Sequence, residues 1–477
     1  MKRLLSTLQK WHMLHFQGPC NAVTQRQMPL LVNKILQRSK ATALQDAQSI
    51  RSRYQTDPVI IARPTKAVVD EQIDICVENL LPNQAVTLHS LQKTEYGHLW
   101  ESFAHYVSST DGTVQVMKDE SLGGSYTGCE PMGFIWSMTP DPEDTKKRRL
   151  MKTDASIPDI VKVSVVDGHI LERAAVKLIL ADTEVERWHM APGVRKVKVR
   201  QNGIVGNLFL PPGPGPFPGI IDLLGATGAA DLRAGPLASH GFATLQLAYI
   251  SHAELPYPTG YFGLTNDYFE EAYNFLNSHP EVAKDRIGIV GLCFGQYFTI
   301  KMATEIPKIN PRCLVGVSGG HFSMMKNETG FAHHCLIEYN AKKPFDTNIP
   351  VSTKHFLLPI LDKPDRILQV GKIRCPLLLI AGEDDQSFPA VEAAADIERK
   401  MKEAGNNHLL TKISYPGAGH IIEPPFFPLN KSSKIQIPTM KTKFYQLWGG
   451  EPKAHAYAQE DSWKRILEFL KQHLAVN

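Results

Sequence analysis

The stretch Gly291-Leu292-Cys293-Phe294-Gly295 decides the fold of this chain. An apolar run at residues 286–290 precedes it, and residues 296–304 continue at helical spacing. A strand that turns sharply into a helix through the pattern G-x-nucleophile-x-G exposes the central side chain at the end of a sheet. The turn holds that central residue in a strained backbone conformation, and only small neighbours let the strand and the helix approach so closely. Cys293 is therefore predicted to be a nucleophile.

An acid and a histidine follow in the order that this turn requires. Residues 376–381 read as a fully buried parallel strand, and Gly382-Glu383-Asp384-Asp385 comes directly after it. Residues 413–420 end a further strand in a glycine-rich turn that carries His420. The order nucleophile, acid, base is that of an α/β-hydrolase. We favour Asp385 as the acid because it is fourth in a G-x-x-D turn. Asp384 remains an alternative, and either carboxylate could instead cap the helix expected over residues 390–402.

These residue types suit nucleophilic catalysis. Thiolate is the reactive form of cysteine, and a neighbouring imidazole can take its proton. A carboxylate then orients the imidazole and stabilises the imidazolium. The backbone N–H groups of Phe294 and Gly225 are expected to form the oxyanion hole, because Gly225 follows the strand predicted at residues 220–224. The alternative for residues 225–228 is an ordinary turn, and a nucleotide-binding loop is rejected because no G-K-[ST] follows.

The front half of the chain shows a different pattern. Short segments of period two, such as residues 72–77 and 85–88, alternate with turn signals, and helical periodicity is nearly absent between residues 57 and 194. This pattern predicts a small, immunoglobulin-like β-sandwich at residues 57–194. The α/β-hydrolase domain is expected at residues 195–477, with residues 182–187 in the connection. A hairpin at residues 196–210, with Asn202-Gly203 at its tip, should open its sheet.

The loop after residues 313–317 is less informative. Its histidines are interpreted as surface residues: His321, His333 and His334. Residues 322–364 contain several Lys, Pro and Asn and little periodicity, so they are expected to form a small lid over the substrate pocket.

Composition excludes several classes of protein. The chain has 477 residues, 43% hydrophobic and 21% charged, with a formal net charge of +4, which is ordinary for a globular protein of two domains. No basic stripe with interleaved aromatic residues suggests a nucleic-acid partner, and no apolar run is long enough to span a membrane. The seven cysteines are odd in number and lack CxxC spacing, which argues against a disulfide framework or a zinc site.

The first 45 residues contain basic residues and no acid, and Asp46 is the first carboxylate. Leu4, Leu5, Leu8 and Trp11 fall on one helical face. These features are typical of a mitochondrial transit peptide, which we place at residues 1–50. The expected location is therefore the mitochondrial matrix. The alternative is a basic tail without a targeting role on a cytoplasmic protein.

Several long stretches resemble the family of type I acyl-coenzyme A thioesterases and bile acid-CoA:amino acid N-acyltransferases. They are residues 122–126, 130–136, 210–222, 268–272, 278–282, 420–425 and 448–452. The resemblance covers the chain from about residue 55 to its end. It implies a β-domain before the hydrolase domain, and it assigns the roles of nucleophile, acid and base to Cys293, Asp385 and His420.

The resemblance leaves the second half-reaction open. It implies a fatty acyl-CoA thioesterase that forms an acyl-Cys293 intermediate and releases free fatty acid and CoA. The alternative is an N-acyltransferase that conjugates the acyl group to glycine or taurine, because a cysteine nucleophile is closer to that branch. A third possibility is a catalytically dead interaction protein. No cofactor is expected, since CoA is part of the substrate and product.

Overall fold

The structure is a computed structural model, and it describes residues 52–142, 150–176, 178–225, 230–250, 252–255, 265–323, 349–436 and 443–475. Residues 59–477 form one compact unit. The predicted transit peptide lies outside the described residues. So do His333, His334 and residues 324–348 of the predicted lid.

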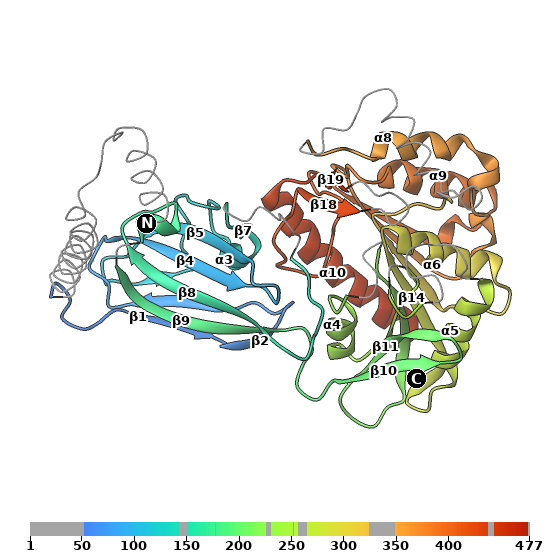
Figure 1. Cartoon of the computed structure of the whole chain (residues 1–477), viewed down its shortest axis with the longest axis horizontal. Helices are drawn as coiled ribbons and strands as arrows, with labels where there is room; N and C mark the ends of the chain where they lie inside the picture. The colour runs from blue at the N-terminus through green and yellow to red at the C-terminus, as the bar shows by residue number, and fades with distance from the viewer. Residues whose placement is uncertain are drawn as a thin grey trace, which may run out of the picture. The chain divides into compact units, whose positions relative to one another are not determined.

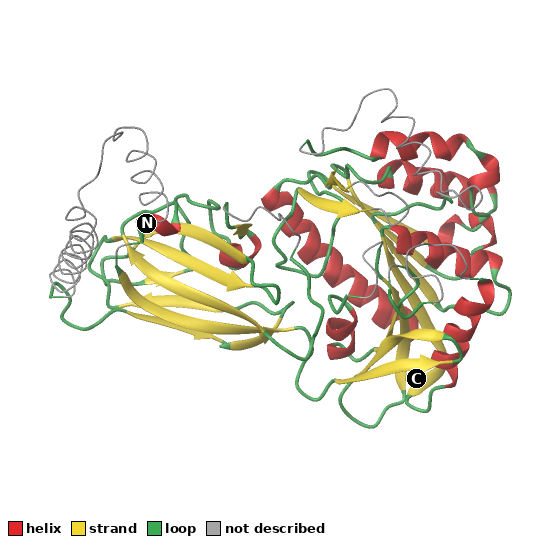
Figure 2. Cartoon of the chain, viewed as in Figure 1, coloured by secondary structure: helices red, strands yellow, loops and turns green. Residues whose placement is uncertain are grey.

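The N-terminal part of this unit is an all-β region, as predicted (Figure 2). Its strands are β1 (Val59–Arg63), β2 (Lys66–Val68), β3 (Asp74–Glu78), β4 (Ala85–Lys93), β5 (Leu99–Val107), β6 (Val114–Gln115), β7 (Thr139–Pro140), β8 (Asp159–Asp167) and β9 (Ile179–Trp188). They form a three-stranded sheet in the order β1-β3-β6 and a six-stranded sheet in the order β2-β9-β8-β4-β5-β7. Two short helical segments accompany them, α3 (Gly133–Trp136) and η1 (Arg173–Ala175).

The interpretation of residues 182–187 as a connection is wrong. They lie in the middle of β9, which pairs antiparallel with β8 through contacts such as Val163↔Thr183. The segment Asp-Thr-Glu-Val-Glu-Arg alternates in burial, with Val185 fully buried among more exposed neighbours. Its charged residues suggested a loop, but alternation of this kind is the pattern of a half-buried strand.

The rest of the unit contains a sheet of eight strands, in the order β10-β11-β13-β12-β14-β15-β16-β17 (Figure 1). The strands are β10 (Arg195–Gln201), β11 (Ile204–Leu210), β12 (Phe217–Leu223), β13 (Ala243–Leu247), β14 (Val282–Leu292), β15 (Cys313–Val317), β16 (Leu377–Gly382) and β17 (Leu410–Tyr415). β11 pairs antiparallel with both of its neighbours, and the pairs from β13 to β17 are all parallel. This is the α/β-hydrolase sheet that the sequence predicts.

The predicted hairpin at the start of this sheet is confirmed. Gln201 pairs with Ile204, so the connection has two residues, Asn202 and Gly203. Their φ angles are +51° and +76°. Asn-Gly adopts such positive φ values readily, and a two-residue turn of this kind matches the twist of the two strands.

Helices cover both faces of the eight-stranded sheet (Figure 1). They are α4 (Ala234–Ser239), α5 (Asn266–Ser278), α6 (Phe294–Glu305), α9 (Ala390–Glu403) and α10 (Pro452–Leu474). Residues of strand β14 pack against helices on both faces of the sheet. Ile287 and Ile289 join the core beneath α5, α6 and α9. A Cβ on Gly288 would instead lie 3.1 Å from Leu474 of α10.

Smaller elements complete the described chain. They are α8 (Lys354–Leu357), η2 (Leu358–Asp362), η3 (Pro364–Arg366), η4 (Val370–Lys372), η5 (Asn407–Leu409) and the antiparallel pair β18 (Ser432–Gln436) and β19 (Lys443–Leu447). The parallel strands end at one edge of the sheet, and loops at that edge usually carry the functional residues of an open α/β fold.

Candidate active site

Cys293 lies in the turn between β14 and α6. Its backbone angles are φ +59° and ψ −122°, a conformation that non-glycine residues rarely adopt. The Cys293 N–H donates to the Val317 carbonyl at 2.8 Å, which anchors the turn to β15. Strain of this kind persists only where the surroundings enforce it, and it is common at reactive residues.

Each of the two glycines in the motif is required by a different steric contact. A Cβ on Gly295 would lie 2.0 Å from the Leu223 carbonyl oxygen, and a Cβ on Gly291 would lie 2.3 Å from Thr299 Oγ1. Neither position can hold a larger residue without a backbone shift. The structure therefore explains the pattern G-x-C-x-G by close approach on both sides of Cys293.

His420 and Asp385 meet at the carboxyl edge of the sheet. The Nδ1–H of His420 donates to Asp385 Oδ2 at 2.8 Å, and the two residues are only 2% and 1% exposed. The second oxygen of Asp385 accepts the N–H groups of Ser387 and Phe388, each at 2.8 Å. Asp385 thus orients the imidazole and also caps the turn that precedes α9.

Asp384, the alternative acid, lies elsewhere. Its Oδ2 accepts the Gly450 N–H at 2.7 Å, and its Oδ1 accepts the side-chain amide of Gln386 at 2.8 Å. Among the described contacts, Asp384 therefore stabilises the turn after β19, whereas Asp385 contacts His420.

Sequence reasoning missed three side chains around His420. The imidazole lies between the rings of Phe388 and Trp448, with centroids 5.4 and 5.5 Å away and nearly parallel planes. His455 of α10 accepts the Gly419 N–H at 3.1 Å and donates to the Ile421 carbonyl at 2.8 Å, so it clamps the chain on both sides of His420. Trp448 stands in one of the stretches that carry the family resemblance, which is the signal that could have indicated its role.

The electrostatics of His420 favour its charged form. Burial lowers its pKa, but the negative charges of Asp385 and Cys293 and the hydrogen bond to Asp385 outweigh burial and raise the pKa to about 10. Nε2 makes no hydrogen bond of ordinary geometry within the described chain. We therefore attribute the Cys293 contribution to charge rather than to a fixed Nε2–Sγ bond. The negative groups around His420 therefore favour its protonated form.

The two predicted oxyanion residues both adjoin Cys293. Phe294 is the first residue of α6, where backbone N–H groups have no partner within the helix. Gly225 follows β12, and a Cβ there would lie 2.9 Å from Cys293 Cβ and 3.3 Å from Sγ. The backbone of Gly225 can approach the nucleophile so closely only because glycine has no side chain.

The interpretation of His321 as a surface residue is wrong. Its side chain is fully buried, and its Nε2 lies 2.8 Å from Asp396 Oδ2. Burial lowers the pKa of His321, although Asp396 opposes this shift. The carboxylate partner is 75 residues away in the chain, so local polarity could not reveal it.

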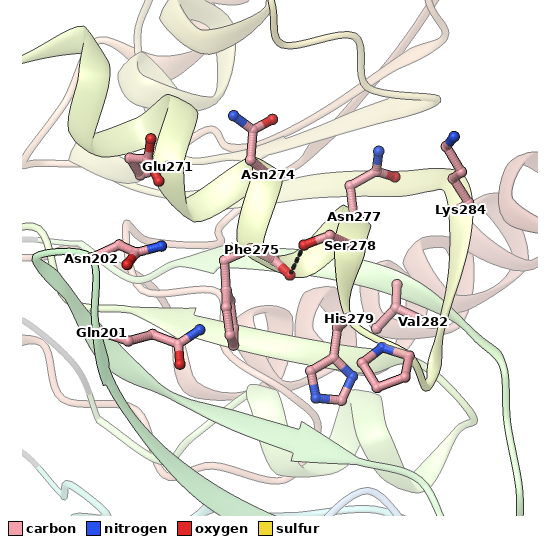
Figure 3. Close-up of a pocket in the computed structure, with 11 residues that line it drawn as sticks. Gln201, Asn202, Glu271, Asn274, Phe275, Asn277, Ser278, His279, Val282 and Lys284 are labelled. Carbon is pink, nitrogen blue, oxygen red and sulfur yellow. Dashed lines mark hydrogen bonds between the residues drawn. The ribbon is translucent and has the colours of Figure 1, made fainter.

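An open cleft of about 610 Å³ lies at the end of the sheet where β14 begins, whereas Cys293 lies where β14 ends (Figure 3). It is lined by residues of the β10–β11 turn, of the last turns of α5 and of the segment that starts β14, such as Asn202, Asn274 and Lys284. Cys293 follows the last residue of β14, so this cleft is not the site of the Cys293 chemistry.

Two absences hold for the residues that the structure describes. None of the helices resolved there has the length and apolar character that crossing a bilayer requires. No group of three or more His, Cys, Asp or Glu side chains suitable for a metal ion occurs there either.

The fold is that of an α/β-hydrolase, with Cys293 in the turn between β14 and α6. Two regions of the chain match models of one protein family. Residues 70–201 match the acyl-CoA thioester hydrolase/BAAT N-terminal region, and residues 264–476 match the BAAT/acyl-CoA thioester hydrolase C-terminal domain. The chain belongs to this family of acyl-CoA thioester hydrolases and bile acid-CoA:amino acid N-acyltransferases.

Individual relatives come from both branches. A mouse (Mus musculus) bile acid-CoA:amino acid N-acyltransferase is 38% identical, over 87% of this chain and 97% of its own length. The mouse mitochondrial acyl-coenzyme A thioesterase 2 is 36% identical, over 85% of this chain and 87% of its own. A putative dienelactone hydrolase from Klebsiella pneumoniae, of known structure, aligns with a TM-score of 0.37 and 14% identity, over 58% of this chain and 98% of its own.

Proposed function

We propose that this protein cleaves fatty acyl-CoA thioesters through an acyl-Cys293 intermediate and releases free fatty acid and CoA. One observation carries the proposal. His420 is oriented by Asp385 at 2.8 Å, and its charge is coupled to that of Cys293 on a strained turn. Nucleophile, base and orienting acid in this relation form the triad of an acyl-transfer enzyme.

In the first half-reaction, Cys293 passes its proton to His420 Nε2, and the thiolate attacks the thioester carbonyl. The carbonyl oxygen becomes an oxyanion within reach of the N–H groups of Phe294 and Gly225. When the intermediate collapses, the bond from the carbonyl carbon to the CoA sulfur breaks. The proton on His420 passes to the CoA sulfur, and the acyl group stays on Cys293.

In the second half-reaction, His420 takes a proton from water as the water attacks the acyl-Cys293 carbonyl. The intermediate then expels the Cys293 sulfur, which takes the proton back from His420, and yields the free acid. Water requires no binding site of its own, and this is why hydrolysis is our first choice. We also propose that the reaction needs no cofactor beyond the CoA of the substrate.

A specific observation favours a second candidate, transfer to the amine of glycine or taurine. The nucleophile is cysteine, so the intermediate is itself a thioester and reacts with amines more readily than an oxygen ester does. The relative at 38% identity is a bile acid-CoA:amino acid N-acyltransferase. Both candidates share the triad and differ only in the group that attacks acyl-Cys293.

One experiment separates these candidates. Purified protein is incubated with palmitoyl-CoA alone, with glycine and with taurine, and the products are identified by mass spectrometry. Free palmitate under all three conditions supports the thioesterase. N-palmitoyl glycine or taurine supports the transferase, and release of neither acid nor CoA would contradict both in favour of a non-catalytic role.

We further propose that the protein works in the mitochondrial matrix. The acid-free basic segment at the N-terminus supports this proposal. Relatives differ in this respect, because one is named mitochondrial and another is a peroxisomal succinyl-coenzyme A thioesterase.

A further inference from the structure

A buried ion pair lies directly behind the expected oxyanion hole. Asp222 stands near the end of β12, and Arg233 immediately precedes α4. The Arg233 Nε–H donates to Asp222 Oδ1 at 2.8 Å, and a terminal guanidinium N–H donates to the same oxygen. The side chains are 1% and 4% exposed. Asp222 and Arg233 stand on either side of residues 223–232, which contain Gly225 and are called the Gly225 segment below.

The same guanidinium also reaches the strand of the nucleophile. Its Nη2 lies 3.4 Å from the Leu223 carbonyl oxygen and 3.5 Å from the Val290 carbonyl oxygen. Val290 pairs with Asp222 in the parallel register of β12 and β14, three residues before Cys293. Arg233 follows the end of the Gly225 segment, and its guanidinium contacts Leu223 at the start of the segment. It also contacts Val290 of β14, the strand that leads to Cys293.

Additional contacts hold the ends of the Gly225 segment. The Tyr249 hydroxyl donates to the Leu224 carbonyl, directly before Gly225. Near the other end, Asp231 accepts a hydrogen bond from Gln246 at 3.1 Å and pairs with Lys196. Gly225 itself packs against Cys293, so a small shift of this segment changes where its N–H points relative to the sulfur.

The ion pair is not expected to contribute much to the stability of the fold. Burying two charges costs solvation that their attraction only partly returns, and well-packed apolar residues often serve stability as well or better. One oxygen of Asp222, Oδ2, is buried and has no hydrogen-bond partner among the described residues. A rigid connection between three backbone segments is something that apolar side chains would not provide.

We propose that Asp222 and Arg233 are positioning residues that set the Gly225 N–H for the oxyanion formed at Cys293. This inference rests on the proposed acyl-CoA chemistry of the same site. Neither residue touches the substrate. Their effect passes through the backbone of residues 223–225 on one side and of Val290 on the other.

The test compares a ground-state ligand with a tetrahedral one. The probes are a palmitoyl-CoA thioether, which Cys293 cannot attack, and the matching trifluoromethyl ketone. The Cys293 thiolate adds to the ketone carbon, and the carbonyl oxygen takes the electron pair and becomes an oxyanion. In Asp222→Asn and Arg233→Lys we expect affinity for the ketone and kcat to fall about 10- to 100-fold, since loss of one oxyanion donor typically costs about 10²–10³. Affinity for the thioether and the rate of Cys293 alkylation by iodoacetamide should stay within about twofold.

Two further variants keep the test decisive if a single substitution destabilises the fold. The double variant Asp222→Leu/Arg233→Met removes both charges while keeping bulk, and it should fold yet show the same selective loss of ketone affinity. Asp159→Asn is the matched control, because Asp159 is 15% exposed and pairs with Lys152 and His189 in the all-β region. It should lower thermal stability without changing the ratio of ketone to thioether affinity.

The outcomes are separable. Equal ketone and thioether losses in the Asp222 and Arg233 variants, or an unchanged ratio in the double variant, would overturn the positioning role. A wild-type protein that forms no adduct with the ketone would contradict the proposed function itself, and the inference would fall with it.

Discussion

His420 Nδ1 lies 2.8 Å from Asp385 Oδ2, and both side chains are almost completely excluded from solvent. Low exposure strengthens their interaction, because water does not screen it. The imidazole is also held between two aromatic rings, so neither its position nor its tautomer is free. The Asp385→Asn prediction, its Asp384→Asn control and the predicted pH dependence of stability follow from this relationship.

Asp385→Asn should lower kcat by about 10³- to 10⁴-fold. The asparagine oxygen can still accept the N–H groups of Ser387 and Phe388, which leaves its NH₂ facing His420. Nδ1 must then accept a hydrogen bond, so Nε2 carries the proton and cannot take another from Cys293. Steady-state kinetics on the purified variant measures the loss.

Asp384→Asn is the matched control for that change. It should be far milder, because Asp384 contacts Gly450 and Gln386 rather than His420. If Asp384→Asn proves the more damaging of the two, the acid has been assigned to the wrong carboxylate.

Cys293→Ala should abolish acyl-CoA cleavage, and Cys293→Ser should reveal the acceptor. Serine keeps the geometry but converts the intermediate into an oxygen ester, which reacts more slowly with neutral amines. A native transferase should lose amide synthesis in the serine form and retain some hydrolysis, whereas a native thioesterase should give free acid in both forms. Mass spectrometry of products made with glycine or taurine present distinguishes them. An acyl adduct trapped on a residue other than Cys293 would refute the mechanism.

The stability of the protein should depend on the protonation of His420. Its pKa rises from 6.5 to about 10 in the folded state, so the native protein binds this proton more tightly than the unfolded chain. The resulting stabilisation is complete below about pH 6.5 and is lost as the pH rises through about 10. Thermal melting of the wild type and of His420→Gln at pH 6, 8 and 10 tests this. The wild type should lose more of its midpoint than the variant, and parallel curves would show that His420 makes no such contribution.

Gly225→Ala should reduce kcat at least about tenfold, since the new Cβ would lie 2.9 Å from Cys293 Cβ and shift an oxyanion donor. Gly123→Ala is a suitable control, because the nearest atom to its new Cβ would be His105 Nδ1 at 3.3 Å, in the all-β region. Full activity in Gly225→Ala would remove Gly225 from the oxyanion hole.

Deletion of residues 1–45 should leave a folded, active enzyme that stays in the cytosol, because the segment is expected to act only as a targeting signal. Fractionation of cells that express the full-length and shortened chains, with activity measured in each fraction, tests this. Mitochondrial import of the shortened chain, or loss of its fold, would contradict the prediction.

Much of the fold could be predicted from local patterns. The Asn202-Gly203 hairpin, the strand–turn–helix around Cys293 and the buried strand before Gly382 each depend on a few neighbouring residues. The predictions for residues 182–187 and for His321 are wrong, and both concern polar residues. In the structure, the polar residues of β9 alternate with buried ones, and Nε2 of His321 is paired with Asp396.

The sequence by itself determined the order of the proposed nucleophile, acid and base and the strand–turn–helix around Cys293, because the strain of that turn acts between neighbours in the chain. The contact of Gly295 with Leu223 appears only in the tertiary structure. Only the tertiary structure decided which carboxylate faces the histidine, and which aromatic side chains enclose it. Asp384 and Asp385 are adjacent, yet one contacts Gly450, 66 residues away, and the other contacts His420, 35 residues away. Side chains of adjacent residues point in different directions, and their partners are brought to them only when the sheet is assembled.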